Sequence, residues 1–270
     1  MSASENTSSI EVSFALRIGE NTLRASLNVP AGKTTLTQLL PIIQNFENGM
    51  IDHVTQEAAA AGRPVSCCAG CGACCRQMVP LSIFEAEALS EWFRTLPEER
   101  QAQIEERFHR GLLALRDAGI LDRLMQPERG NDLEEFTQLA IDYFHAGVPC
   151  PFLEDESCSI HPIRPLVCRE YLVTSPAELC KDPSIHQISA IRLPLMASSA
   201  LYKIGRELTQ DQRGWIPLIF LLAWMKKDSK PGGYYTGLGQ EVLRVFIEHL
   251  TTELPAEDEL ARSAGLMQAE

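Results

Sequence analysis

The chain carries little positive charge for its length. Its 270 residues include 24 Lys and Arg against 36 Asp and Glu, which gives a formal net charge of -12. A field of this sign repels phosphate backbones and anionic lipid headgroups. We therefore expect neither a nucleic-acid partner nor a membrane partner.

Long hydrophobic runs are also missing. The most apolar stretch, residues 215–225, contains a proline and is too short to cross a bilayer. The first ten residues are polar and rich in Ser, with no basic start and no apolar run, so we expect no signal peptide. These absences predict a cytoplasmic protein, a compartment in which thiols stay reduced.

Hydrophobic periodicity predicts a mainly α fold of the α+β type. Residues 11–29 alternate between apolar and polar positions on either side of Gly19, Glu20 and Asn21, which predicts a small N-terminal β-hairpin. Segment 148–172 has four prolines and little periodicity, so we expect a knuckle of turns there. Helical spacing and capping signals predict helices over 34–61, from Ser82, from Pro97, from Asn131 or Asp132, and over 186–208, 214–227 and 238–252.

This pattern divides the chain into three parts. Residues 1–64 form the hairpin and a helix, 65–172 form a cysteine-cluster metal-binding domain, and 173–270 form a C-terminal helical region packed on it. The two cysteine-bearing loops are separated by about 75 residues of helix. We expect antiparallel helices to bring these loops together at one metal site.

The nine cysteines are the most informative residues. In a reducing compartment, clustered cysteines indicate metal or redox chemistry and not a disulfide framework. Cys68, Cys71 and Cys74 are evenly spaced. Three thiolates cannot close a tetrahedral zinc site, but they can supply three corners of a cubane iron–sulfur cluster whose fourth ligand is a distant cysteine. The candidates for the distant ligand are Cys150, Cys158 and Cys168.

Three of the remaining cysteines are harder to assign from spacing alone. Cys75 directly follows Cys74, and adjacent thiolates do not reach one ion without strain, so Cys75 either faces a second metal or supports the first from outside. Cys67 lies outside the spaced run. Cys180 stands alone, and an isolated cysteine is most often a small buried hydrophobic residue.

The run of four cysteines, followed by Cys150 before Pro151, Cys158 and then Cys168 after Arg164 and Pro165, resembles the YkgJ-type (CxxCxxCC) cysteine-cluster family. That family is described as a zinc- or iron-chelating domain, and the resemblance covers about residues 65–172. It implies metal ligation by seven thiolates. These are Cys68, Cys71, Cys74, Cys75, Cys150, Cys158 and Cys168.

The resemblance leaves the activity open. A flagellin lysine methylase carries a similar cysteine cluster, which implies that some members are enzymes. Where the family usually has Tyr, this chain has His161, which is either a ligand or a packing residue.

We expect Arg164 and Arg169 to contact the cofactor, because guanidinium groups offset the negative charge of several thiolates. The alternative is that Arg164 only holds the Pro-rich knuckle through carbonyls. The cofactor predicted from the ligands is an iron–sulfur cluster, with the 4Fe–4S type favoured and a redox or transferase role open. The alternatives are zinc in a structural or interaction module without catalysis, and a metal storage or delivery protein.

Overall fold

The computed structural model describes residues 8–18, 20–126, 133–209, 213–227 and 234–252. The fold is mainly α with a few short strands, as the hydrophobic periodicity predicts. Gly19 of the expected hairpin turn and the expected helix cap at Asn131 or Asp132 lie outside the described residues. None of the described helices is long and apolar enough to cross a membrane.

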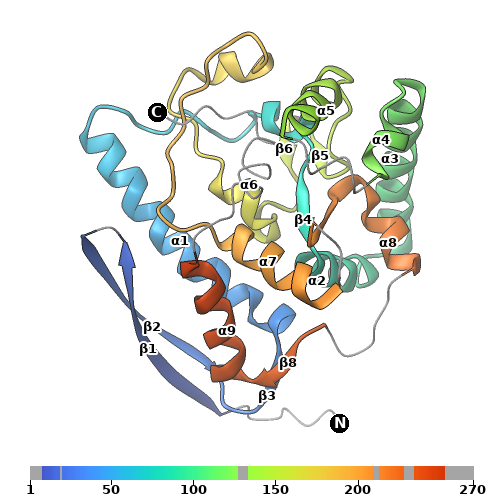
Figure 1. Ribbon diagram of the computed structural model, residues 1–270. Helices are drawn as coiled ribbons and strands as arrows, with labels where there is room; N and C mark the ends of the chain where they lie inside the picture. The colour runs from blue at the N-terminus through green and yellow to red at the C-terminus, as the bar shows by residue number, and fades with distance from the viewer. Residues whose placement is uncertain (1–7, 19, 127–132, 210–212, 228–233, 253–270) are drawn as a thin grey trace.

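The predicted N-terminal hairpin is confirmed. Strands β1 (Ser9–Ile18) and β2 (Asn21–Pro30) pair antiparallel from Ser9 opposite Pro30 to Ile18 opposite Asn21. Its apolar face packs through Leu16 and Val29, which are 3% and 0% exposed, against helices α1 (Leu36–Ala60) and α9 (Gly239–Thr251). The hairpin therefore covers one edge of the molecule (Figure 1).

Helix α1 begins where local chemistry favours a start. Strand β3 (Lys33–Thr35) pairs with β8 (Thr236–Leu238), and Thr35 then caps the helix. The Thr35 hydroxyl accepts from the Gln38 amide at 3.1 Å while the Gln38 side chain accepts from the Thr35 amide at 2.9 Å. This reciprocal capping box satisfies two amides that the first helical turn leaves unpaired.

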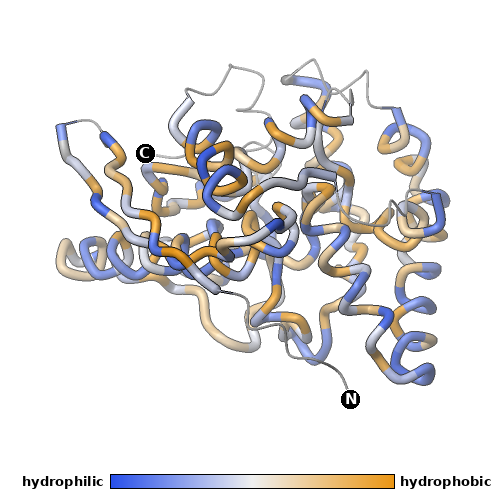
Figure 2. Tube along the Cα trace, turned by 90° about the horizontal axis from the view of Figure 1, so that it is seen from below, coloured by the Kyte–Doolittle hydropathy of each residue, from blue (hydrophilic) through white to orange (hydrophobic). Residues whose placement is uncertain are grey.

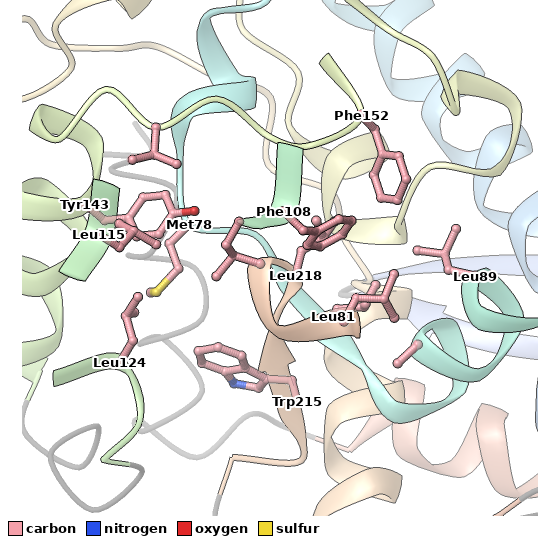
Figure 3. Packing of buried hydrophobic residues seen from close by; sticks show 14 of the residues in the cluster. Met78, Leu81, Leu89, Phe108, Leu115, Leu124, Tyr143, Phe152, Trp215 and Leu218 are labelled. Atoms are coloured by element: carbon pink, nitrogen blue, oxygen red, sulfur yellow. The ribbon is translucent and has the colours of Figure 1, made fainter. Parts of the chain in front are cut away.

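Most of the remaining helices surround the first of the two larger cores, which lie apart from a small cluster of Val173, Cys180 and Ile188. This core lies among α2, α3, α4, α5, strands β4 and β7, and the short helix η5. Figure 3 shows Phe108, Phe152, Leu218 and Trp215 within it. Phe108 and Phe152 meet edge to face with ring centroids 5.7 Å apart. The bounds of these elements are β4 (Pro80–Ser82), α2 (Ile83–Arg94), α3 (Glu98–Asp117), α4 (Leu121–Leu124), α5 (Leu133–His145), β7 (Trp215–Pro217) and η5 (Leu218–Phe220).

The second core joins parts of the chain that lie far apart in the sequence. It gathers the hairpin, α1, α9 and α7 (Ala197–Thr209) around residues that are almost fully buried, such as Leu39 and Phe246. Helix α2 lies between the cores: Phe84 belongs to the second core and Phe93 to the first. Figure 2 shows the matching alternation of hydrophilic and hydrophobic positions along the hairpin and helices. The division at residues 64 and 172 stays a prediction.

Two of the predicted helices are partly wrong. Residues 186–196 are not helical, and α7 starts only at Ala197. Pro194 disfavours helix at the residue before it, and Ile191 instead donates to the Leu172 carbonyl at 2.8 Å. Residues 214–227 begin as strand β7, because Ile216 pairs with Leu81, and only α8 (Leu221–Lys227) is α-helical. The predicted helix over 238–252 is confirmed as α9.

Short elements carry most of the cysteines. The expected knuckle over 148–172 contains a β-hairpin, whose strands are two residues long, and two short helices in addition to turns. The bounds are η1 (Ala73–Arg76), β5 (Leu153–Glu154), β6 (Ser157–Cys158), η3 (His161–Ile163), α6 (Leu166–Glu170) and η4 (Ala177–Lys181). Since such elements bury little surface of their own, they depend on the neighbouring helices for their positions.

Glu85 on α2 is one such support. Its carboxylate accepts from the Ser82 amide at 3.1 Å, from the Ser82 hydroxyl at 2.7 Å, and from the Leu166 amide at 2.7 Å at the start of α6. The residue is 3% exposed. Glu85 thus caps its own helix and fixes the start of the helix that carries Cys168.

We expect Glu85→Ala to lower the free energy of unfolding by about 3 kcal/mol, since losing the cap costs about 1 kcal/mol and a buried amide left unpaired costs about 1–3 kcal/mol. The matched control is Glu91→Ala, an exposed position on the same helix, which should change it by less than about 0.5 kcal/mol. Urea unfolding followed by circular dichroism measures both. Equal stabilities of the two variants would contradict this role for Glu85.

Candidate metal centre

The two cysteine-bearing loops meet directly. The amide of Cys150 donates a hydrogen bond of 2.6 Å to the carbonyl of Cys75, although 75 positions separate them. Within the first loop, the Cys71 amide donates to the Cys68 carbonyl at 3.2 Å, and the Cys75 amide donates to the Gly72 carbonyl at 3.1 Å. These bonds curl the loop into consecutive turns, and its thiols line the same cavity.

A tight hairpin presents Cys158 to the first loop. Strands β5 and β6 are joined by Asp155 and Glu156, whose φ angles of 48° and 57° lie in the left-handed region that a two-residue turn of this type requires. Arg76 then donates two hydrogen bonds to the Glu156 carboxylate, at 2.7 and 3.0 Å. A Cβ atom on Gly72 would lie 2.6 Å from that carboxylate and 3.2 Å from the Glu156 Cα, so a larger residue there would displace the Glu156 side chain from its present position.

The same hairpin is held to helix α3. Glu154 on β5 pairs with Arg107 at 2.5 Å and also with Arg100, and all three side chains are 25–30% exposed. Partial burial alone would raise the pKa of Glu154, but the guanidinium groups of Arg107 and Arg100 outweigh it and lower this pKa. The hairpin therefore rests on α3 through a charged contact.

Helix α6 is fixed on the side opposite Glu85. The Glu170 carboxylate accepts from the Ser198 amide at 2.9 Å and from the Ser198 hydroxyl. Arg169 is 6% exposed and donates to the carbonyls of Pro162 and Arg164 at 2.5 and 3.2 Å. Its guanidinium group thus holds the Pro-rich turn that precedes Cys168.

All nine cysteines line one cavity of about 650 Å³. The seven thiols expected from the resemblance are joined there by two that the sequence pattern set aside, Cys67 and Cys180. Arg164, Arg169 and His161 also line the cavity. The walls come from the loop before η1 and from η1, β6, α6 and η4.

Ionisation of most of the buried thiols is unfavourable inside this cavity. Burial raises the pKa of Cys150 to about 12 and also raises the pKa of Cys168, with further contributions from neighbouring thiols. In contrast, a hydrogen bond from the Cys75 thiol lowers the pKa of Cys74 to about 7, despite burial and with help from Arg164. Most of these thiols are therefore protonated without a cation, and metal binding must release their protons.

Arg164 and His161 have different environments at the rim. The Nε atom of Arg164 is buried and has no hydrogen-bond partner among the described residues. Partial burial and the positive charges of Arg164 and Arg169 lower the pKa of His161, so its imidazole is neutral at pH 7. A neutral imidazole is the form that binds metals.

The donor set fits a soft metal. Thiolates bind zinc and iron–sulfur clusters in preference to hard cations. Among the described residues, which include every cysteine, no three Cys, His, Asp or Glu side chains converge closely enough to bind a single ion. The thiols instead line a shared, partly open cavity.

The comparisons with known proteins agree with this donor set. Residues 67–189 match the CxxCxxCC family. Its description is "Putative zinc- or iron-chelating domain", which supports metal binding and covers both metals. The match starts at Cys67 and extends past residue 172 to include Cys180. No curated protein and no solved structure matches the chain.

The charged contact under the β5–β6 hairpin predicts a pH effect. Since the folded-state pKa of Glu154 lies below its ordinary value of 4.5, the contact stabilises the protein above that pH and is lost as the pH falls through the lower folded value. The free energy of unfolding of the parent chain should fall as the pH is lowered from about 5 to about 3. In Glu154→Gln we expect this fall to be smaller by about 1 kcal/mol. Denaturant unfolding at several pH values measures this. An identical acid slope in the variant and the parent chain would contradict it.

Proposed function

We propose that this chain is a metal-binding protein that holds an iron–sulfur cluster through thiolates from both cysteine-bearing loops. The single observation that carries the proposal is the shared cavity, which is lined by every cysteine in the chain. The proposed ligands are the seven thiols implied by the resemblance. These are Cys68, Cys71, Cys74, Cys75, Cys150, Cys158 and Cys168.

The spacing of the thiols favours a cluster over a single zinc ion. A tetrahedral zinc site draws four sulfurs to about 2.3 Å from one point. In a four-iron cluster each thiolate binds a different iron, so the sulfurs stand apart around the core. The cysteines of both loops line a shared volume of about 650 Å³, which has room for a polynuclear core and supports the cluster.

Charge balance also supports a metal cluster. Several thiolates around a cluster give a net negative group, and a buried negative group requires compensation. At the cavity wall, Arg164 has a buried Nε–H that finds no partner in the part of the chain that the structure describes, and its charge acts on Cys74 and Cys158. We infer that Arg164 faces the cofactor, while Arg169 positions the Cys168 segment through its carbonyl contacts.

When bound, an iron–sulfur cluster supplies one-electron redox chemistry or a Lewis-acidic iron. The protein's own contribution is to gather the thiols and orient Arg164. An enzymatic role would be redox or transferase chemistry, and it requires a substrate beside the cluster. Zinc is the second candidate, because the family description includes it and thiolates bind it tightly.

The first test is the metal content of protein purified without oxygen. We expect iron and acid-labile sulfide in equal amounts and a brown protein with broad absorption near about 400 nm. Zinc at about one or two ions per chain in a colourless protein would contradict the cluster. Protein that contains neither iron nor zinc would contradict metal binding itself.

Substitutions in each loop test shared ligation. Cys71→Ser and Cys168→Ser should each lower the bound metal per chain by about half or more, because a serine hydroxyl is a poor ligand for soft metals. The control is Ala69→Ser, which adds a hydroxyl to the exposed part of the first loop without removing a thiol. Unchanged metal content in either cysteine variant would contradict ligation by both loops.

A further inference from the structure

Helix α6, which carries Cys168, also contacts α1 through buried acidic side chains. Glu47 of α1 is 0% exposed, Glu170 of α6 is 2% exposed and Glu85 of α2 is 3% exposed. Glu47 is hydrogen-bonded to Glu170, and the charge of Glu85 acts on it as well. Glu47 is not one of the residues that line the cysteine cavity. It therefore belongs to the support of α6 and not to the candidate metal centre.

Two members of this acidic group are supplied with hydrogen-bond donors. The Glu85 carboxylate accepts from Ser82 and from the amide of Leu166. The Glu170 carboxylate accepts from the amide and from the hydroxyl of Ser198. Each of the two carboxylates thus accepts at both of its oxygens, and such donors stabilise the ionised form of a buried carboxyl group.

Glu47 is in a different environment. Neither of its carboxyl oxygens accepts a hydrogen bond from any residue that the structure describes. The nearby Arg169 guanidinium donates to the side chain of Asn48 at 3.2 Å and to backbone carbonyls of the Pro-rich turn. A buried carboxylate without a donor loses its hydration and gains nothing in return. A carboxylic acid avoids this cost, because it is neutral and can donate its own O–H to the Glu170 carboxylate.

The electrostatics of the site agree with a neutral Glu47. Burial is the largest effect that raises the pKa of Glu47, and the charge of Glu170, the hydrogen bond to Glu170 and the charge of Glu85 raise it further. The positive charge of Arg169 acts in the opposite direction, but this pKa stays well above its ordinary value. A direct hydrogen bond between two carboxyl groups also requires a proton between them.

The other elements that pack on α1 present few charges to Glu47. The hairpin and α9 contribute apolar side chains to the second core, and Lys33 of β3 is exposed. The acidic and basic residues of the hairpin and α9 are exposed too, apart from His249, which pairs with Glu207 of α7 at 3.1 Å. The other titratable residues of α1 itself are exposed. The charged groups that face Glu47 are therefore those of α2 and α6.

We propose that Glu47 is a neutral carboxylic acid that donates its proton to the Glu170 carboxylate, and that this hydrogen bond is a pH-sensitive contact which holds α6 against α1. Removal of the proton places a negative charge beside Glu170 and Glu85, and Arg169 is the positive group that opposes it. The contact then becomes repulsive, and the helix that carries Cys168 loses one of its supports. This goes beyond the proposed function, because the contact requires neither iron nor zinc.

The direction of the pH effect follows from the two states of Glu47. In the unfolded chain its pKa is close to the ordinary value of 4.5, and in the folded chain its pKa lies well above that value. Below pH 4.5 both states hold the proton, and the stabilisation is fully present. As the pH rises, the unfolded chain releases the proton first, so the folded chain loses stability until the pH passes the folded pKa. Through this contact the protein therefore becomes less stable toward alkaline pH.

The infrared spectrum tests the protonation directly. At pH 7 exposed carboxyl groups are ionised, so a C=O stretching band of a neutral carboxylic acid comes from a buried one. The parent chain should show this band, and Glu47→Gln should lose it, while the amide keeps the shape and an N–H donor toward Glu170. The matched control is Glu91→Gln, an exposed position on α2, which should leave the band unchanged. The same band in the parent chain and in Glu47→Gln would overturn the inference.

The pH dependence of unfolding is the second measurement. From about pH 5 to about pH 7, the unfolding equilibrium constant of the parent chain should rise relative to that of Glu47→Gln. The rise should reach up to about tenfold for each pH unit, which is the linkage of one proton. Urea unfolding followed by circular dichroism gives both constants, on proteins of equal metal content. A ratio of the two constants that stays the same over this range contradicts the inference.

A cation between the two carboxylates is the alternative to a proton. In that case added K⁺ or Mg²⁺ would stabilise the parent chain and not Glu47→Gln, and this result would rule the proton out. If Glu47→Gln does not fold, Glu47→Met takes its place in the infrared comparison, since it removes the carboxyl group and keeps a long side chain. A folded parent chain that shows no neutral carboxyl band at pH 7 overturns the inference without any variant.

Discussion

The structure around the cysteines depends on holding two distant loops together before a metal is present. A thiol cluster in a partly buried cavity gains little from its own contacts, because protonated thiols form only weak hydrogen bonds. The loops are held instead by backbone and charged contacts, above all the bond from Cys150 to Cys75 and the paired bonds from Arg76 to Glu156. These contacts fix the cavity, and the cavity decides which thiols lie together.

The helical scaffold serves this arrangement. Helix α2 lies between both cores, and its Glu85 fixes the start of α6. Helix α7 holds the other end of α6 through Ser198 and Glu170. Since short elements such as α6 and η1 have little stability alone, the two cores set where the thiols stand. The large helical part of the chain therefore acts as the support of the cysteine region.

Sequence patterns predicted the parts of the fold that local chemistry decides. Alternation predicted the hairpin, and the capping signal at Ser82 predicted the start of α2. Periodicity failed over 186–196, where apolar residues serve a loop that bonds to Leu172, and Pro194 disfavours a helix. The β strand at 215–217 was missed because its partner, β4, lies more than 130 residues earlier in the chain.

The sequence predicted the type of ligand at the candidate site, but it did not predict every residue that lines the cavity. Spacing identified the evenly spaced cysteines, and the need for a distant ligand gave Cys150, Cys158 and Cys168 as candidates. The resemblance added Cys75, and all seven line the cavity. Cys180 has no spacing signal, because its place depends on η4 packing against η1. In the same way, the sequence did not show that Arg169 bonds to carbonyls while the buried Nε of Arg164 has no partner, since this depends on how the turn before α6 folds.

The central claim is that the cysteine-lined cavity holds a polynuclear iron–sulfur centre. X-ray absorption at the iron and zinc edges of protein purified without oxygen tests this most directly, because it reports the atoms around the metal. The account predicts iron surrounded by sulfur alone, with a second shell of neighbouring iron atoms. A zinc edge with four sulfurs at about 2.3 Å and no neighbouring metal would contradict it, as would iron bound mainly to oxygen or nitrogen.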